Sequence, residues 1–155
     1  MQPTIHHVGI LVFNQVEVLD FCGPYEVFSI ANECQNQKTF DVQLISTDEV
    51  NLKARNKFKF EADYTIESHP PLDILIIPGG PGTRHQECNT QLIQWLENQF
   101  QNLKYLLTIC TGARILAHAN FIQDAVVTTH WNSLKDLKQI NPDINVVDNV
   151  RYTDN

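Results

Sequence analysis

The chain has 155 residues, a formal net charge of −7 and a hydrophobic fraction of 43%. This length supports one sizeable core and is short for two ordinary domains, so we expect a single domain over residues 1–155. The acidic balance disfavours direct binding of nucleic acid, which requires a clustered basic surface. No apolar run approaches the roughly 20 residues of a membrane-spanning helix, and the N-terminus has no signal-peptide pattern, so we expect a cytoplasmic protein.

Apolar runs and helical spacing alternate along the first half of the chain. Residues 5–13 are apolar and β-branched, which is typical of a buried strand. A helix is predicted from Gly23 onward, with Pro24 in its first turn and apolar residues at helical spacing. Residues 40–46 alternate as a strand does, and residues 58–62 alternate again in a more peripheral strand.

The second half continues the same alternation. Residues 72–77 are almost continuously apolar, as in a strand covered on both faces, and they end at a glycine-rich loop, residues 79–82. Later elements are predicted in the order helix, strand, helix, strand, helix and strand, at residues 92–100, 105–109, 113–119, 125–128, 134–137 and 144–147. This pattern predicts an α/β fold with a mostly parallel sheet, in which ligands bind beyond the carboxyl ends of strands.

Cys110 is the residue with the strongest chemical signal. It lies where a predicted buried strand meets a helix N-terminus, in the turn Thr-Ile-Cys-Thr-Gly-Ala, residues 108–113, which we call the Cys110 turn. Small residues around a reactive side chain permit a tight strand-to-helix bend, and a helix N-terminus stabilises a thiolate. We therefore expect a nucleophile with a lowered thiol pKa. A buried core cysteine is the alternative.

Asp20 follows the first strand and lies between apolar neighbours at a predicted strand-to-helix junction. A carboxyl group there could share a proton with the cysteine sulfur if burial raises its pKa, or it could simply cap the helix. Thr111 is likewise either a donor to the site or a helix cap. His130 is either an acid/base or ligand-positioning group or a structural partner of Trp131.

The glycine loop could present backbone N–H groups to negative charge that develops on a substrate atom, although a plain turn would look the same. It lacks the lysine and the spacing of a phosphate-binding loop, which disfavours nucleotide binding. The four cysteines are scattered and no histidine spacing builds a metal site, so reduced thiols and no metal are expected. Cys22 lies two residues from Asp20, and a resolving-cysteine role is a minor alternative for it.

Three segments together resemble the DJ-1/PfpI superfamily, namely LDFCGPYEVF at residues 19–28, DILIIPGGPGTR at 73–84 and ICTGARILAHANFIQDAVVTTHW at 109–131. Within that superfamily the chain is similar to the isocyanide hydratase branch, and also to the amidase-like sensor domains of AraC-type regulators. The resemblance implies a flavodoxin-like three-layer sandwich and a homodimer. It also implies that the chain lacks the C-terminal part of the family fold, because family members continue past residue 155.

The resemblance further assigns roles at the site. Cys110 would be the nucleophile, Asp20 its hydrogen-bonded acidic partner, and Gly80 and Thr111 would contact the developing negative charge. Gly79, Pro81, His130 and Trp131 would bind substrate.

The implied reaction hydrates an isocyanide to an N-substituted formamide through a thioimidate on Cys110, without a cofactor. Thr111 stands where the protease-like branch has histidine, which argues against peptidase chemistry. Two alternatives are a ligand-sensing domain of an AraC-type regulator and a DJ-1-like redox or carbonyl-stress protein in which Cys110 is oxidised.

Overall fold

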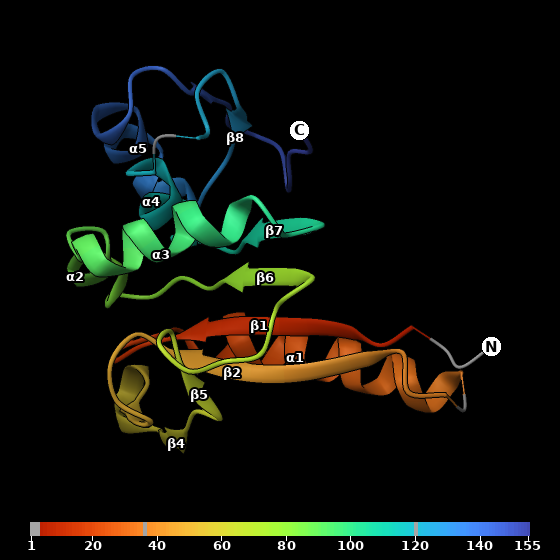
Figure 1. Ribbon diagram of the computed structural model, residues 1–155. Coiled ribbons are helices and arrows are strands. Elements are labelled where there is room, and N and C mark those ends of the chain that lie inside the picture. Colours follow the sequence, from red (N-terminus) through yellow and green to blue (C-terminus); the bar gives the residue numbers. More distant parts are fainter. Residues whose placement is uncertain (1–3, 36, 120) are drawn as a thin grey trace.

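The computed structural model describes residues 4–35, 37–119 and 121–155. Its centre is a five-stranded sheet in which every neighbouring pair of strands is parallel, with the order β5-β2-β1-β6-β7 (Figure 1). The strands are β1 (His6–Val12), β2 (Phe40–Ser46), β5 (Tyr64–Thr65), β6 (Ile74–Ile77) and β7 (Tyr105–Thr108). The predicted α/β class with a parallel sheet is confirmed.

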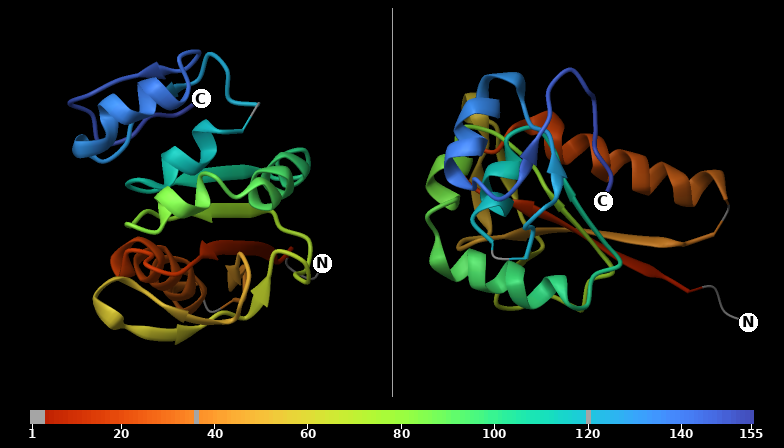
Figure 2. Two further views of the ribbon diagram at one scale, coloured as in Figure 1. Left: turned by 90° about the vertical axis from the view of Figure 1, so that its left-hand side faces the viewer. Right: turned by 90° about the horizontal axis from the view of Figure 1, so that it is seen from above.

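The core forms between this sheet and helices on both of its faces. The helices α1 (Val18–Cys34) and α3 (Thr90–Phe100) lie on opposite faces of the sheet, which gives three layers (Figure 2). β1 and β6 are central strands, and their apolar side chains are buried because helices cover both faces. The largest fully buried side chains of the central strands and α3 are Ile10, Leu11, Leu75, Ile76, Ile77, Leu92 and Leu96.

The first helix differs from its prediction. It begins at Val18 rather than near Gly23, so Asp20 lies in its first turn and Pro24 lies inside the helix. The helix starts early because the backbone N–H of Asp20 already bonds the carbonyl of Glu17 at 3.2 Å. Of the helix residues, only Phe21 is buried, and the apolar spacing that predicted the helix does not mark a buried face, since Val27 is 67% exposed.

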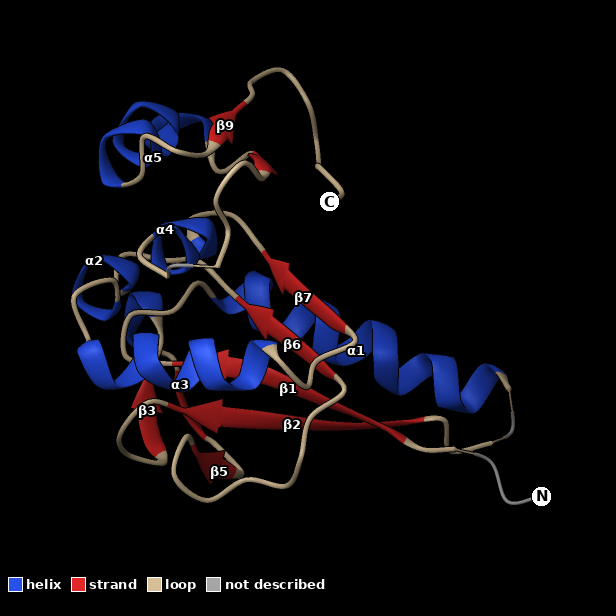
Figure 3. Ribbon diagram, turned by 45° about the horizontal axis from the view of Figure 1, so that its top comes forward, coloured by secondary structure: helices blue, strands red, loops and turns tan. Residues whose placement is uncertain are grey.

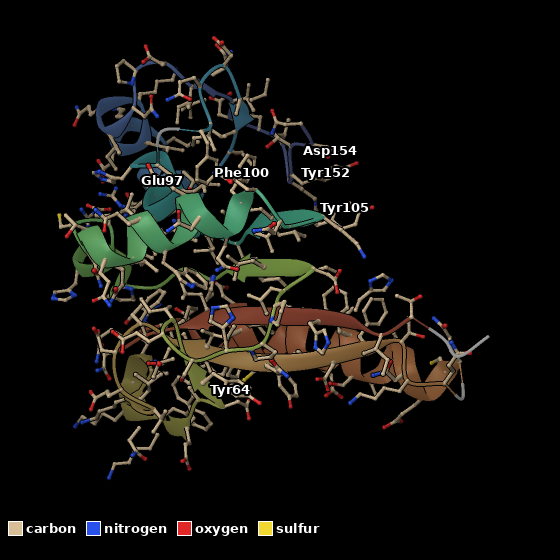
Figure 4. The ribbon with its side chains drawn as sticks, in the orientation of Figure 1. Tyr64, Glu97, Phe100, Tyr105, Tyr152 and Asp154 are labelled. Carbon is tan, nitrogen blue, oxygen red and sulfur yellow. The ribbon has the colours of Figure 1, made fainter. Side chains whose placement is uncertain are left out.

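The strand that precedes Cys110 is at the edge of the sheet. β7 pairs only with β6, and its residues alternate between exposed and half-buried. The prediction of a buried strand is therefore wrong here, because Tyr105 and Leu107 share a face of β7 that is exposed in the described chain. Tyr105 marks the amino end of this strand, and Phe100 marks the end of the preceding helix α3 (Figure 4). Cys110 follows its other end.

Smaller elements surround the sheet. β3 (Asn51–Lys53) and β4 (Lys59–Glu61) form a separate antiparallel pair joined by the 3-10 turn η1 (Arg55–Lys57), so the predicted strand at 58–62 is peripheral. β8 (Val126–Val127) and β9 (Asn145–Val146) form a separate parallel pair outside the main sheet. The remaining helical elements are α2 (Thr83–Gln86), α4 (Gly112–Ala117), η2 (Trp131–Ser133) and α5 (Leu134–Ile140).

The strands of the main sheet point toward the side of the molecule that carries α2 and α4 (Figure 3). Residues that follow β1, β6 and β7 therefore meet at one edge, as expected for a parallel sheet. Within the described residues, no helix combines the length and the apolarity needed to cross a bilayer.

Candidate functional site

Cys110 occupies a strained turn between β7 and α4. Its φ of 54° lies in the left-handed region, which costs a non-glycine residue roughly 1–2 kcal/mol. Two hydrogen bonds hold the turn in place. The N–H of Gly112 donates to the carbonyl of Ile109 at 2.8 Å, and the hydroxyl of Thr129 donates to the carbonyl of Cys110 at 2.7 Å. Strain that the surrounding structure maintains at one reactive side chain is typical of a functional site.

The first turn of α1 places the Asp20 carboxyl next to this thiol. Oδ2 of Asp20 accepts a hydrogen bond from the N–H of Gly79 at 3.1 Å, and the carboxyl lies close enough to the Cys110 thiol for each group to shift the pKa of the other. The alternative of a helix cap does not hold, because Glu17 rather than Asp20 is the residue that precedes α1. The geometry therefore brings Asp20 and Cys110 together.

The glycine loop fits tightly between these two residues. A Cβ on Gly79 would stand 2.6 Å from the backbone nitrogen of Thr111, 2.7 Å from its Oγ1 and 3.0 Å from Oδ2 of Asp20. Any side chain at residue 79 would thus separate the acid from the Cys110 turn. Gly80 has a φ of 125°, a conformation that is open to glycine and strained for other residues.

The N–H groups of this loop are engaged inside the protein. The N–H of Gly79 donates to Asp20, and the N–H of Gly80 donates to Oγ1 of Thr111 at 2.9 Å. The expectation that Gly80 offers its N–H to a substrate oxyanion therefore does not match this geometry. Thr111 does not cap α4 with its side chain, since its hydroxyl bonds the glycine loop instead.

Burial and mutual repulsion control the protonation of the acid–thiol pair. Burial raises the pKa of the Asp20 carboxyl, against the opposing effect of the Gly79 N–H. Burial also raises the pKa of the Cys110 thiol, and the negative charge of Asp20 raises it further. The expected lowering of the thiol pKa is wrong. Hydrogen bonds from the backbone N–H and the hydroxyl of Thr111 oppose the increase without cancelling it. Both groups therefore keep their protons to a higher pH than they would in water.

A pocket of about 270 Å³ opens in front of Cys110. Of the predicted site residues, Gly80, Pro81, Cys110, Thr111 and His130 line it. Asp20 and Gly79 are not among its lining residues. Trp131 also does not line the pocket, and its side chain is 76% exposed. The other lining residues are Arg55, Thr83, Arg84, Arg114, Asn132 and Ser133.

His130 lines the pocket and lies within electrostatic range of Asp20. It lies in the pocket wall, its Nδ1 accepts the N–H of Asn132 at 3.3 Å, and its ring packs on Trp131 with centroids 5.3 Å apart. A positive charge on His130 would also favour the ionised form of Asp20. The contact with Trp131 is thus present, and the acid/base or ligand-positioning role stays a prediction.

Three arginines in the wall were not found by sequence reasoning. Arg114 is buried and forms two hydrogen bonds to the Glu87 carboxylate, from Nε at 2.7 Å and Nη2 at 2.9 Å, and a third to Asp136 at 2.8 Å. Arg84 also reaches Asp136, at 3.2 Å, and Arg55 reaches Glu17 at 2.6 Å. They come from three elements far apart in the sequence, so only the fold reveals the cluster.

The other cysteines lie outside the site. Cys22, Cys34 and Cys88 are free and exposed, and the structure does not place Cys22 in the pocket wall. Among the described residues, histidine, cysteine and carboxylate side chains do not gather in a group of three that would hold a metal ion.

Comparison with protein families gives a match over most of the chain. The DJ-1/PfpI family profile matches residues 6–155. The fold is also found in a crystal structure of a ThiJ/PfpI family protein from Pseudomonas syringae, with a TM-score of 0.84 and 18% identity. That similarity covers 99% of this chain and 60% of the other.

Two curated relatives carry functional names. An isonitrile hydratase from Pseudomonas putida is 31% identical over 124 residues, which are 80% of this chain and 52% of that protein. The HTH-type transcriptional regulator GbdR from Pseudomonas aeruginosa is 21% identical over 135 residues, which are 87% of this chain and 36% of the regulator. The chain thus spans about half or less of the length of these relatives.

Proposed function

Because the chain belongs to the DJ-1/PfpI family, we propose that its site performs cysteine-dependent hydration of isocyanides, with Cys110 as nucleophile and Asp20 as proton carrier. The observation that carries the proposal is the closeness of the Asp20 carboxyl to the Cys110 thiol, whose pKa it raises, beside a pocket that Cys110 lines. The similarity to the isonitrile hydratase supports the reaction class.

The proposed first step joins sulfur to the terminal carbon of R–N≡C. Asp20, as the carboxylate, takes the thiol proton while the sulfur attacks, and the proton is then delivered to the same carbon. The product of this step is the thioimidate R–N=CH–S–Cys110. The raised pKa values of both groups suit this exchange, because a thiol that stays protonated needs a base, and a buried carboxyl is a stronger base than an exposed one.

The second step uses water. A water molecule adds to the thioimidate carbon, its proton passes to nitrogen, and the C–S bond breaks as sulfur regains a proton. The released product is R–NH–CHO, so the atoms of one isocyanide and one water are accounted for. The hydroxyl and backbone N–H of Thr111 lie at the sulfur and would stabilise it as the leaving thiolate.

The direct test is turnover of a simple alkyl isocyanide, followed by formamide formation in NMR. Cys110→Ser and Asp20→Asn are expected to lower kcat/KM by at least about 100-fold, the usual contribution of a nucleophile or a positioned proton carrier. Cys34→Ser is the matched control, because it replaces an exposed thiol of the same chain. Full activity in Cys110→Ser would exclude the mechanism.

A second candidate function is a ligand-sensing domain, which the similarity to GbdR favours. In that function the same pocket binds a small molecule without converting it. A helix-turn-helix segment in the coding sequence beyond residue 155, together with isocyanide binding but no formamide, would favour the sensor. The homodimer and a redox role of Cys110 stay predictions, which sedimentation and mass spectrometry after peroxide treatment would check.

A further inference from the structure

The pocket wall contains several arginines and is not balanced by acidic residues among those described. Arg55, Arg84 and Arg114 line it, whereas no carboxylate of the described chain does. They come from η1, α2 and α4, so three separate elements each contribute an arginine to the wall of one small pocket.

The carboxylate partners of these arginines lie outside the lining. Glu17 pairs with Arg55, Glu87 with Arg114, and Asp136 with both Arg84 and Arg114. Each ion pair is therefore a dipole whose positive end contributes to the pocket wall. Paired charges partly cancel at a distance, but inside a small pocket the nearer guanidinium has the larger effect.

Two of the guanidinium groups have N–H donors to spare. Arg55 uses only Nη1 and Arg84 only Nη2 in the side-chain hydrogen bonds among the described residues, and their side chains are 53% and 66% exposed. Arg114, in contrast, is committed to two carboxylates and fixes one side of the wall. Arg55 is also close enough to Cys110 for its charge to interact with the thiolate.

We propose that the pocket selects substrates that carry a carboxylate or a similar anionic group, which Arg55 and Arg84 bind while the reactive carbon faces Cys110. Conversion of the bound molecule rests on the proposed function, whereas the preference of the pocket for an anion does not. It concerns any electrophile that reaches the thiol.

Paired alkylating reagents test the preference without reference to turnover. Iodoacetate is anionic and iodoacetamide is its neutral analogue, and both react with the same thiolate, so the thiol pKa cancels in the ratio of their rates. Mass spectrometry gives the rate with iodoacetate divided by the rate with iodoacetamide, both at Cys110 and, in the same chain, at the exposed Cys34. We expect the ratio at Cys110 to be about tenfold larger, and to decrease at high salt.

Charge variants identify the source of the preference. Arg55→Gln and Arg84→Gln are each expected to lower the ratio at Cys110 by about two- to threefold, while Glu17→Gln raises it because Arg55 loses its counter-charge. Lys38→Gln is the matched control. Lys38 is also an exposed cation in a 2.6 Å ion pair, but its partner Asp41 lies near the amino end of β2, away from the pocket. The proposal would be overturned by equal rate ratios at Cys110 and Cys34. It would also be overturned if Lys38→Gln lowered the ratio at Cys110 as much as the two arginine variants do.

A pair of isocyanides separates this inference from the proposed function. Isocyanoacetate is expected to have a kcat/KM about tenfold above that of its neutral methyl ester, and Arg55→Gln is expected to reduce the difference. Hydration of the ester with no advantage for the anion would overturn the inference and leave the proposed function intact. If neither compound is hydrated, the proposed function fails, and the alkylation ratio alone decides the anion preference.

Discussion

The hydroxyl of Thr129 donates a hydrogen bond to the carbonyl oxygen of Cys110 at 2.7 Å, across 19 positions of sequence. This bond gives the half-buried carbonyl of Cys110 a hydrogen-bond partner. It also holds the backbone in a strained conformation that it would otherwise relax from. Thr129→Val keeps the shape and removes the donor, and we expect it to lower the free energy of unfolding by about 1–2 kcal/mol. Thr129→Ser retains the hydroxyl and should lose clearly less. Urea unfolding of both variants checks this, and an equal loss would contradict the role of the bond.

The strained backbone of Cys110 gives a second prediction. Alanine and glycine both remove the sulfur, but only glycine adopts a φ of 54° without cost. Cys110→Gly is therefore expected to be about 1 kcal/mol more stable than Cys110→Ala, after the greater flexibility of unfolded glycine is included. Thermal and urea unfolding give the comparison. Greater stability of the alanine variant would show that the turn relaxes when the thiol is absent.

Asp20 should make stability depend on pH in a definite direction. Burial raises its pKa in the folded state, so folding favours the protonated carboxyl. The stabilisation from this proton is complete below the unfolded pKa and is lost as pH rises through the folded pKa. At neutral pH, where the carboxyl of the unfolded chain is ionised, this burial therefore lowers the stability of the folded protein. Asp20→Asn keeps an acceptor for the Gly79 N–H and removes that cost.

We expect Asp20→Asn to raise Tm by on the order of one to three degrees at pH 7 and by nothing near pH 3. All other carboxyl groups are shared by the two proteins, so their titration cancels in the difference. Scanning calorimetry across this range is the measurement. A constant difference in Tm, or one that grows toward low pH, would show that burial does not dominate at Asp20.

Gly79 should tolerate no side chain. Gly79→Ala would push apart Asp20 and Thr111, and we expect a loss of about 2–4 kcal/mol in stability together with slower alkylation of Cys110. Gly23→Ala is the matched control, because a Cβ there meets nothing within 4 Å inside α1. That variant should change the stability by less than about 1 kcal/mol, because the higher helix propensity of alanine is opposed by crowding against Pro24. Similar behaviour of the two variants in unfolding and alkylation assays would contradict the close approach at residue 79.

The sequence predicted the layers of the fold well, because strand and helix spacings differ clearly. The strand at residues 40–46 is confirmed to the residue as β2, and the parallel sheet follows from the alternation. The start of α1 was placed late because Pro24 is typical of a first helical turn, whereas here it lies inside the helix. The exposure of β7 was missed because apolar residues do not reveal which strand is at an edge.

At the site, the sequence identified Cys110 and Asp20 as candidates, and the structure brings them together. The direction of the thiol pKa was wrong, because the argument weighed the helix N-terminus and not burial beside a carboxylate. The engaged N–H of Gly80 and the wall of Arg55, Arg84 and Arg114 could not be predicted. Both depend on contacts between segments that the sequence keeps apart.

The environment of Cys110 is assembled from the first turn of α1, the glycine loop and the segment after β8, so it exists only when these distant parts have docked. In a nascent or refolding chain, its thiol would be chemically equivalent to those of Cys22, Cys34 and Cys88. The time at which the alkylation rate of Cys110 departs from those of the other three cysteines would therefore mark the docking of these segments. Pulsed alkylation during refolding would measure that time directly.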